Sequence, residues 1–317
     1  MKTLVAFLGL VALMQQAPVP PAGQHVQKIV LNVSNNAGSY AIGLKKEDFI
    51  LEEGGVEKEI TGLSESSDVP ISFGLLIDKS TSMRLPMYVE GREYVPAALL
   101  AGTRIGRALV RLMRPEDEFL LMTFDYKLHV KQNFTQDHKK IENELAKLHE
   151  VGENTHLYES IPDALDKMKK AKYRQRALIV ITDAYDTSGK EFEDLRFKIA
   201  EYEIPVFTCG LRAAFDNIQD PGAESLFQLV LRGLSTDTGG LSAVIDIPEL
   251  NNERMIEGLI RFAQIITLEM RGQYTLTYNT EQSGPLASRF IRVRSTRPEL
   301  RVRLRRDADQ PLAAPAK

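Results

Sequence analysis

The middle of the chain alternates apolar runs with amphipathic segments. Five apolar runs of strand length predict strands, at Ile71–Asp78, Glu118–Asp125, Ala177–Asp183, Ile204–Gly210 and Leu241–Ile245. Between them, apolar residues recur at three- and four-residue spacing, which predicts helices over residues 94–113, 138–150, 157–171, 192–202, 223–234 and 248–270. Strands that alternate with helices predict an α/β fold with a doubly wound, mostly parallel sheet and helices on both faces.

Strand-like patterns flank this segment on both sides. They fall at residues 26–33, 49–52 and 56–60 before it, and at residues 273–278, 290–293 and 300–304 after it. Each flank has about forty residues, which is too few for a stable core of its own. We therefore expect residues 25–69 and 269–306 to pair as a small β-sandwich. The α/β domain, residues 70–268, would be inserted into it, and residues 307–317 would form a loose tail.

The first 24 residues have the pattern of a signal peptide followed by a Pro-rich linker. Lys2 precedes the apolar stretch Leu4–Met14, and small residues and prolines follow it. The stretch is too short to span a bilayer, which takes roughly 20 residues, and no later stretch is long enough. We expect an exported protein, either periplasmic, secreted or on the cell surface, without a transmembrane segment in the mature chain. The pattern does not define the cleavage position.

Composition narrows the classes of function. A chain of 317 residues has room for about two domains. Its 40 basic and 43 acidic residues give a net charge of −3, so no nucleic-acid partner is expected. The single cysteine, Cys209, rules out an internal disulfide framework and a Cys-rich metal centre. Nothing in the composition indicates the oligomeric state.

Candidate chemistry gathers at the carboxyl ends of the predicted strands, where ligands bind in a doubly wound sheet. Asp78 ends the first strand, and Ser80 and Ser82 follow at alternate positions. Asp183 ends another strand. Two neighbouring carboxylates repel each other unless a cation lies between them. Carboxylate and hydroxyl oxygens suit a hard ion, so we expect Mg²⁺ here, with Mn²⁺ or Ca²⁺ as alternatives.

These residues resemble the von Willebrand factor type A domain and its metal-ion-dependent adhesion site. The matching parts are Asp78-x-Ser80-x-Ser82, then Thr155 in a later loop, then Asp183 after a later strand, in that order. The resemblance covers about residues 70–268 and implies a Rossmann-like binding domain without enzymatic activity. It also implies that Ser80, Ser82 and Thr155 contact the metal directly, and that Asp78 and Asp183 act directly or through water. A partner protein would present an Asp or Glu to the ion.

The flanks extend the resemblance, and the site departs from it at two places. Residues 43–53 and 273–278 are similar to the von Willebrand factor A-related proteins that some bacteria export. The family often has glycine before the Thr and directly after the last Asp, where this chain has Glu153-Asn154 and Ala184. These substitutions indicate altered loops, and the Glu153 carboxylate would compete with that of a partner. We expect the loops at residues 83–95 and 213–222 to supply specificity.

Two other classes of function compete with adhesion. One is a metal-dependent hydrolase or phosphotransferase with Asp78 as nucleophile. Ser80 argues against it, because haloacid-dehalogenase-type enzymes need an acid at that position. The other is a scaffold whose metal is purely structural. Asp78–Ser82 taken alone also fits a turn and helix cap.

Neighbouring polar residues have simpler interpretations. We expect Lys79 to point into solvent, His156 to lie at the surface or behind the ligands, and Asp186 and Ser188 to form a turn that leads into a helix.

The last predicted strands carry eight arginines: Arg289, Arg292, Arg294, Arg297, Arg301, Arg303, Arg305 and Arg306. Within residues 301–305 they alternate with apolar residues, as in a strand with one solvated face. The alternative is a patch for anionic polysaccharide, lipid headgroups or nucleic acid. Single-stranded nucleic acid is disfavoured because no aromatic residues are interleaved for stacking.

Overall fold

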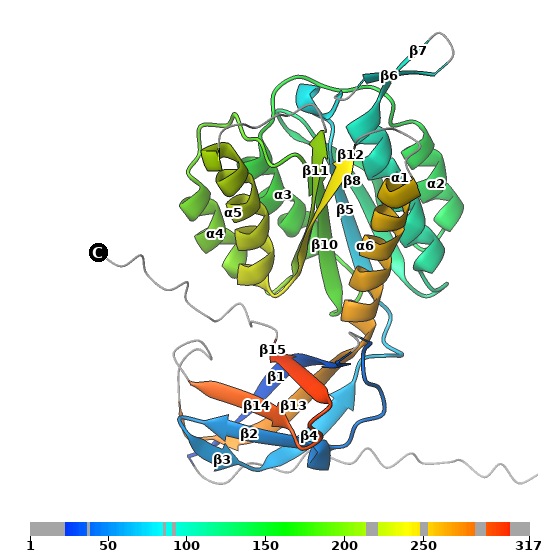
Figure 1. Ribbon diagram of the computed structural model, residues 1–317. Coiled ribbons are helices and arrows are strands. Elements are labelled where there is room, and N and C mark those ends of the chain that lie inside the picture. Colours follow the sequence, from blue (N-terminus) through cyan, green and yellow to red (C-terminus); the bar gives the residue numbers. More distant parts are fainter. Residues whose placement is uncertain are drawn as a thin grey trace, which may run out of the picture.

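A six-stranded sheet forms the middle layer of the α/β domain, the upper part of the molecule in Figure 1. The computed structural model describes residues 23–36, 39–84, 87–90, 93–213, 221–247, 253–282 and 290–304. The sheet has the order β12-β11-β10-β5-β8-β9. Its strands are β5 (Ser72–Asp78), β8 (Glu118–Phe124), β9 (Leu128–Thr135), β10 (Arg176–Thr182), β11 (Val206–Ala213) and β12 (Ser242–Ile247). All pairs are parallel except β8 with β9, which confirms the predicted fold class.

Six helices cover the two faces of this sheet. They are α1 (Ala97–Leu112), α2 (His138–Ala146), α3 (Leu157–Met168), α4 (Phe192–Ala200), α5 (Pro221–Thr238) and α6 (Glu253–Arg271). Successive residues of β5 point to opposite faces: Leu75 and Ile77 pack with α1, α2 and α6, while Leu76 packs with α3, α4 and α5. Every residue of β5 is buried, which explains its uninterrupted apolar pattern.

The structure differs from the prediction at the start of the first helix and in two places where strands were not predicted. The predicted helix over residues 94–113 begins only at Ala97, because residues 94–96 belong to a hairpin of β6 (Met87–Glu90) and β7 (Glu93–Pro96). That hairpin occupies much of the loop predicted at residues 83–95. Strand β9 was missed because it lies at an edge of the sheet and is half-exposed, so its sequence has no apolar run.

Strands from both ends of the chain pair below the α/β domain (Figure 1). One sheet has the order β15-β1-β13-β4 and the other β14-β2-β3. Their bounds are β1 (His25–Asn35), β2 (Phe49–Glu53), β3 (Val56–Lys58), β4 (Ile60–Glu65), β13 (Gln273–Thr280), β14 (Ile291–Ser295) and β15 (Leu300–Leu304). Both sheets contribute to one apolar core that includes Leu31, Leu51 and Tyr274, so they form a sandwich.

Ion pairs account for part of the arginine-rich C-terminal strands. Arg294 pairs with Glu52, Arg297 with Asp48 and Arg303 with Glu269. Arg292 lies against the ring of Phe290, and Arg301 is exposed. Arg289, Arg305 and Arg306 lie outside the described residues. Three of the five described arginines thus attach these strands to the rest of the molecule.

The α/β domain and the sandwich are joined through the end of α6, which continues into β13 after Gly272. The Asn32 side chain donates a hydrogen bond to the carbonyl of Glu269, at 2.8 Å. Arg271 pairs with Asp117, a buried aspartate that also accepts the backbone N–H groups of Ile71 and Arg114. No helix among the described residues has the length and apolarity needed to cross a membrane. The predicted signal peptide and tail lie outside those residues, as does most of residues 213–222.

Candidate metal centre

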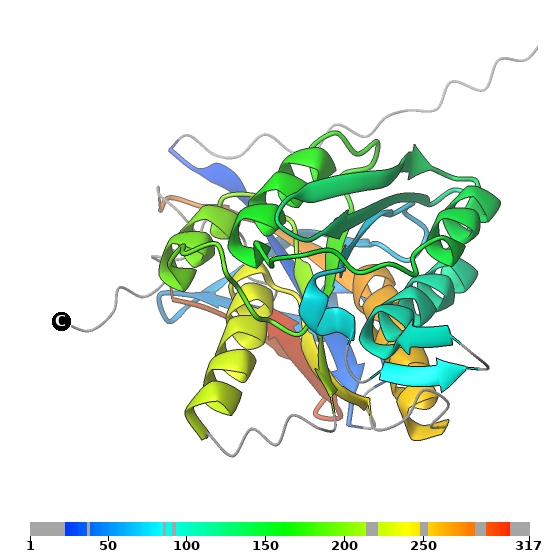
Figure 2. The same ribbon diagram turned by 90° about the horizontal axis from the view of Figure 1, so that it is seen from above.

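Three neighbouring strands end in aspartate at the upper edge of the sheet. In the order β10-β5-β8, Asp183 follows β10, Asp78 ends β5, and Asp125 follows β8. Parallel strands present their carboxyl ends at one edge of the sheet, so the three aspartates lie at the same edge, which is the side of the α/β domain viewed in Figure 2. This edge is where the sequence predicted a ligand site.

Asp78 is fully buried and accepts hydrogen bonds from neutral groups. Its Oδ1 accepts the backbone N–H of Ser80 at 2.8 Å, and its Oδ2 accepts the Thr182 hydroxyl at 2.7 Å. Burial raises the pKa of this carboxyl to about 7, and the nearby charge of Asp183 adds to the effect. The two predicted carboxylates therefore lie close enough to repel each other.

The two predicted serines come together where β5 leads into the short 3-10 helix Thr81–Arg84: Ser80 directly precedes this helix and Ser82 lies in it. The Ser80 and Ser82 hydroxyl oxygens are 3.1 Å apart, and Ser80 is buried. Thr81, between them, turns away: its N–H donates to the carbonyl of Glu153 at 3.0 Å, and its hydroxyl donates to the carbonyl of Gly152 at 2.9 Å. These bonds fix the serine turn against the loop that carries Thr155.

Thr155 is buried and is held by the loop that follows Asp183. Its N–H donates to the hydroxyl of Thr187 at 3.0 Å, and its carbonyl accepts the N–H of Thr187 at 2.7 Å. The carboxylate of Asp183 accepts the N–H of Tyr185 at 3.2 Å. The five predicted ligands thus lie on three loops that are hydrogen-bonded to one another at the carboxyl edge.

The two departures from the family pattern have different consequences. Ala184 has φ of 60°, the left-handed region that glycine adopts without strain, and it keeps this conformation with its N–H donating to the Thr182 hydroxyl. The turn that a glycine would serve is therefore formed at the expense of local strain. The side chain of Glu153 is exposed, and only its backbone contacts the serine turn.

Asp125 and Lys79 form an ion pair that the sequence analysis missed. The Lys79 ammonium is 2.7 Å from Asp125 Oδ2, so it does not point into solvent as predicted. His129 Nε2 lies 2.9 Å from Asp125 Oδ1. Burial by itself would raise the pKa of Asp125. The hydrogen bonds from Lys79 and His129 outweigh burial, so the pKa lies below its ordinary value. The one available signal was that Asp125 ends its predicted strand as Asp78 and Asp183 end theirs.

Gly152 is a second residue that the sequence analysis missed. Its N–H donates to the carbonyl of Lys79. A Cβ at this position would lie 2.8 Å from the Cβ of Asp125 and closer still to its carboxylate. Only glycine therefore lets the Thr155 loop approach the Lys79–Asp125 pair this closely.

Asp186 and Ser188 form a turn, as predicted, but it serves the start of α3. Asp186 Oδ1 accepts the N–H of Tyr158, and Oδ2 accepts both the N–H and the hydroxyl of Ser188. His156 is the N-cap residue of α3, but its side chain accepts no hydrogen bond from the first N–H groups of the helix. Asp186, from another loop, accepts one of them in its place. The His156 ring lies 3.1 Å from Glu159 and is only partly exposed.

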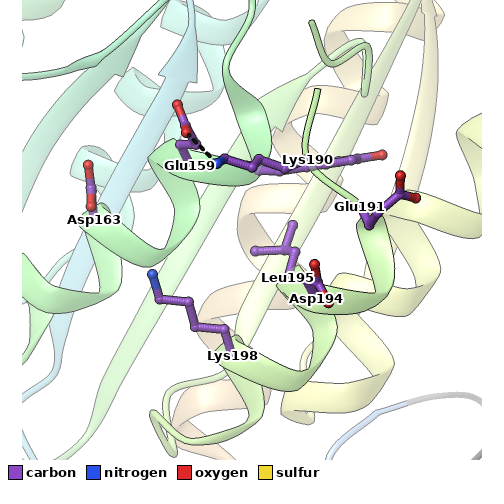
Figure 3. A pocket seen from close by; sticks show the side chains of 8 residues that line it. Glu159, Asp163, Lys190, Glu191, Asp194, Leu195 and Lys198 are labelled. Atoms are coloured by element: carbon purple, nitrogen blue, oxygen red, sulfur yellow. Dashed lines mark ion pairs between the residues drawn. The ribbon is translucent and has the colours of Figure 1, made fainter. Parts of the chain in front are cut away.

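A polar hollow of about 400 Å³ lies between α3 and α4, beside this loop (Figure 3). Its walls are Tyr158, Glu159, Asp163, Lys190, Glu191, Asp194, Leu195 and Lys198. Lys190 is 3.7 Å from Glu159, and Figure 3 shows Lys198 extending from α4 toward α3. Burial raises the pKa of Tyr158 to about 12, so its hydroxyl stays protonated at neutral pH. None of the five predicted metal ligands lines this hollow.

The donor set fits a hard divalent ion. Within the described ranges, no three His, Cys, Asp or Glu side chains cluster in a way that could hold a metal. An ion at this edge would therefore depend on the hydroxyls of Ser80, Ser82 and Thr155 as well as on Asp78 and Asp183. Oxygen donors of this kind match Mg²⁺, Mn²⁺ and Ca²⁺, not zinc or copper.

Residues 74–186, which include all five predicted ligands, match the family of the von Willebrand factor type A domain. The chain contains a von Willebrand factor type A domain. Among curated proteins, none matches it.

Solved structures similar to the chain have low identity. The conserved hypothetical protein BatB from Bacteroides thetaiotaomicron is 17% identical, over 62% of this chain and 98% of that one, with a TM-score of 0.46. The von Willebrand factor type A protein from Catenulispora acidiphila is 13% identical, over 73% of this chain and 51% of that one, with a TM-score of 0.49. The vWF domain of the type V pili tip protein Mfa5 from Porphyromonas gingivalis is 14% identical, over 64% of this chain and 96% of that one, with a TM-score of 0.46.

Proposed function

We propose that the von Willebrand factor type A domain is a protein-interaction module whose binding depends on a divalent metal ion. The ion, Mg²⁺ or alternatively Mn²⁺ or Ca²⁺, would be held by Ser80, Ser82 and Thr155 together with Asp78 and Asp183. It would provide a fixed positive charge for an Asp or Glu side chain of a partner protein. Domains of this type are commonly interaction or adhesion modules.

The observation that carries this proposal is the electrostatic state of Asp78. The Asp78 carboxylate is fully buried and lies close to that of Asp183, and its hydrogen-bond donors are neutral groups of Ser80 and Thr182. In this environment the ionised form is strongly disfavoured. A divalent cation would reverse that preference, and the Ser80 and Ser82 hydroxyls lie together on the same turn as additional donors.

Specificity would come from the side chains around the ion. Tyr185 is 63% exposed and lies two residues after Asp183, and Tyr126 is 47% exposed and follows Asp125. The carbonyl of Asp125 accepts the N–H of His156, which places Tyr126 beside the Thr155 loop. Exposed tyrosines around a charged anchor are typical of protein-binding surfaces.

The burial of Asp78 argues against the hydrolase or phosphotransferase alternative. A nucleophilic carboxylate needs an oxygen that a substrate can reach in line. Both Asp78 oxygens accept hydrogen bonds and the side chain is fully buried, so neither oxygen is exposed for in-line attack on a substrate. We also propose that the chain is exported, on the basis of the basic and apolar pattern at its N-terminus.

The proposal is tested by titrating Mg²⁺ and Mn²⁺ into the chelator-treated protein by calorimetry. We expect saturable binding to one site, lost in Asp78→Ala and in Asp183→Ala. Asp163→Ala, an exposed carboxylate in the neighbouring hollow, is the control and should bind as the wild type does. Metal binding that survives both site substitutions would refute the proposed centre.

A second measurement separates adhesion from a purely structural metal. A peptide with one central Asp and its Asn counterpart are compared for binding to the metal-loaded and the chelator-treated protein. Adhesion predicts binding of the Asp peptide only, and only with metal. A structural metal predicts a higher melting temperature with metal but no preference between the peptides.

A further inference from the structure

A groove lies on the side of the α/β domain, and none of the five proposed metal ligands lines it. Helices α1 and α6 run side by side over one face of the sheet (Figures 1 and 2). Between them is a groove of about 280 Å³, lined by Arg104, Arg107, Ala108 and Arg111 of α1 and by Ile256, Leu259 and Ile260 of α6. We call it the arginine groove.

The arginines of this groove form a row along α1. Arg104, Arg107 and Arg111 are three and four residues apart, so they lie on one face of the helix and span about 10 Å along its axis. Arg107 and Arg111 form no ion pair or hydrogen bond within the described part of the chain. Two exposed glutamates of α6, Glu253 and Glu257, also form no ion pair or hydrogen bond within the described part of the chain, so they do not pair with these arginines. A chain with a net charge of −3 therefore carries a local row of positive charge.

The opposite wall of the groove is apolar. Ile256 and Ile260 are four residues apart and lie on one face of α6, and Ile260 is 44% exposed. Burial of such a side chain against a partner removes apolar surface from water and therefore favours binding. An apolar wall facing a row of guanidinium groups matches a ligand that is itself apolar on one side and anionic on the other.

Size and shape decide which ligand of this chemistry fits. A groove of about 280 Å³ lies at the lower end of the roughly 300–1,000 Å³ typical of ligand pockets, and it has room for a few side chains of a partner. Both walls are helices with a repeat of three to four residues. A third helix laid across them presents its own side chains with the same repeat.

We infer that the arginine groove docks an amphipathic helix of a partner protein whose apolar stripe is flanked by Asp or Glu residues. The apolar stripe contacts Ile256 and Ile260, and the acidic flank pairs with Arg107 and Arg111. This surface is separate from the carboxyl edge, so binding here does not need a metal ion and does not depend on the function proposed above.

The test uses a designed helical probe. A fluorescein-labelled peptide of about 18 residues carries a leucine stripe flanked by glutamates, and a twin peptide carries lysine in place of each glutamate. Their binding to the full chain is followed by fluorescence anisotropy, in Mg²⁺ and in chelator. We expect at least tenfold tighter binding of the acidic peptide, to the same extent in both buffers.

Variants then locate the binding site. Arg107→Glu with Arg111→Glu should weaken binding of the acidic peptide at least tenfold and strengthen binding of the lysine twin. Ile260→Ser should weaken the acidic peptide about fivefold. Lys139→Glu with Lys140→Glu, two exposed lysines of α2, makes the same charge change elsewhere and should leave binding unchanged. Circular dichroism melting curves verify that each variant is folded.

Either of two results overturns the inference. One is equal affinity of the wild type and the Arg107→Glu, Arg111→Glu variant for the acidic peptide. The other is wild-type binding to phosphatidylglycerol vesicles, lost in that variant, without binding of either peptide. The second result would assign the groove to an anionic membrane surface.

Discussion

Replacement of Gly152 by alanine should damage the candidate metal centre without touching any of its five proposed ligands. The added Cβ would lie 2.8 Å from the Cβ of Asp125, closer than real Cβ atoms come to their neighbours. Asp125 cannot move away freely, because Lys79 holds it at 2.7 Å and His129 at 2.9 Å. The Thr155 loop must therefore shift, and the bond from the Thr81 hydroxyl to the Gly152 carbonyl shifts with it.

The expected cost follows from the size of this overlap. One methyl group forced into a well-packed site costs about 1–3 kcal/mol. We expect Gly152→Ala to lower the free energy of unfolding by about 2 kcal/mol, which corresponds to a melting temperature about 4–8 °C lower for a domain of this size. Mg²⁺ affinity should fall about tenfold, because the loop that carries Thr155 no longer meets the serine turn.

Gly258→Ala is the matched control, since the same methyl group is added where there is room for it. Gly258 lies inside α6, and its new Cβ would be 3.9 Å from the nearest atoms of Ile245. Alanine in a helix interior stabilises by about 0.5–1 kcal/mol relative to glycine. Thermal melting by circular dichroism and metal titration by calorimetry are measured on both variants. A Gly152→Ala protein with the melting temperature and Mg²⁺ affinity of the wild type would refute the steric argument.

Three further predictions concern the site and the domain junction. Ala184→Gly should raise the free energy of unfolding by up to about 1 kcal/mol by removing the strain at φ of 60°, and an unchanged urea midpoint would contradict this. In chelator, the raised pKa of Asp78 means that the folded state binds the extra proton, so stability should fall as pH rises from about 4 through 7. Asp78→Asn should remove this fall from melting curves measured against pH, and persistence of the same slope would exclude Asp78 as its source. Arg271→Ala should lower the free energy of unfolding by about 3 kcal/mol, because buried Asp117 would lose its cation. Arg297→Ala removes a half-exposed arginine from its ion pair and should lower it by less than about 1 kcal/mol in the same urea denaturation assay. Equal losses in the two variants would refute the role of burial.

Burial on both faces explains which strands the sequence could predict. Every position of β5 and β8 is buried, so each strand has a mostly apolar sequence with clear ends. Strand β9 has exposed positions because it has a neighbour on one side only, and its polar sequence does not differ from that of a loop. The hairpin β6–β7 stands next to α1 in the sequence, where its residues extended the helical periodicity by three positions.

The candidate site was predictable only as far as its residues lie in a recognisable order. The Asp-x-Ser-x-Ser spacing is local, and Thr155 and Asp183 follow it on expected elements. Lys79 and Asp125 are 46 residues apart, and their pairing depends on β5 and β8 being neighbours, which a single sequence does not determine. The same holds for Gly152, whose role is defined by the carboxylate it faces.

The three aspartates at the carboxyl edge differ in how their charge is compensated. Asp125 is buried but has Lys79 and His129 as partners, so its pKa lies below its ordinary value and it needs no further cation. Asp78, on the next strand, receives hydrogen bonds from the neutral groups of Ser80 and Thr182 and is raised to a pKa of about 7. Lys79 follows Asp78 directly in the sequence, yet its ammonium is directed to Asp125. In the proposed centre, a bound divalent ion would balance the negative charge of Asp78, which Lys79 does not do, and would thereby favour the ionised carboxylate.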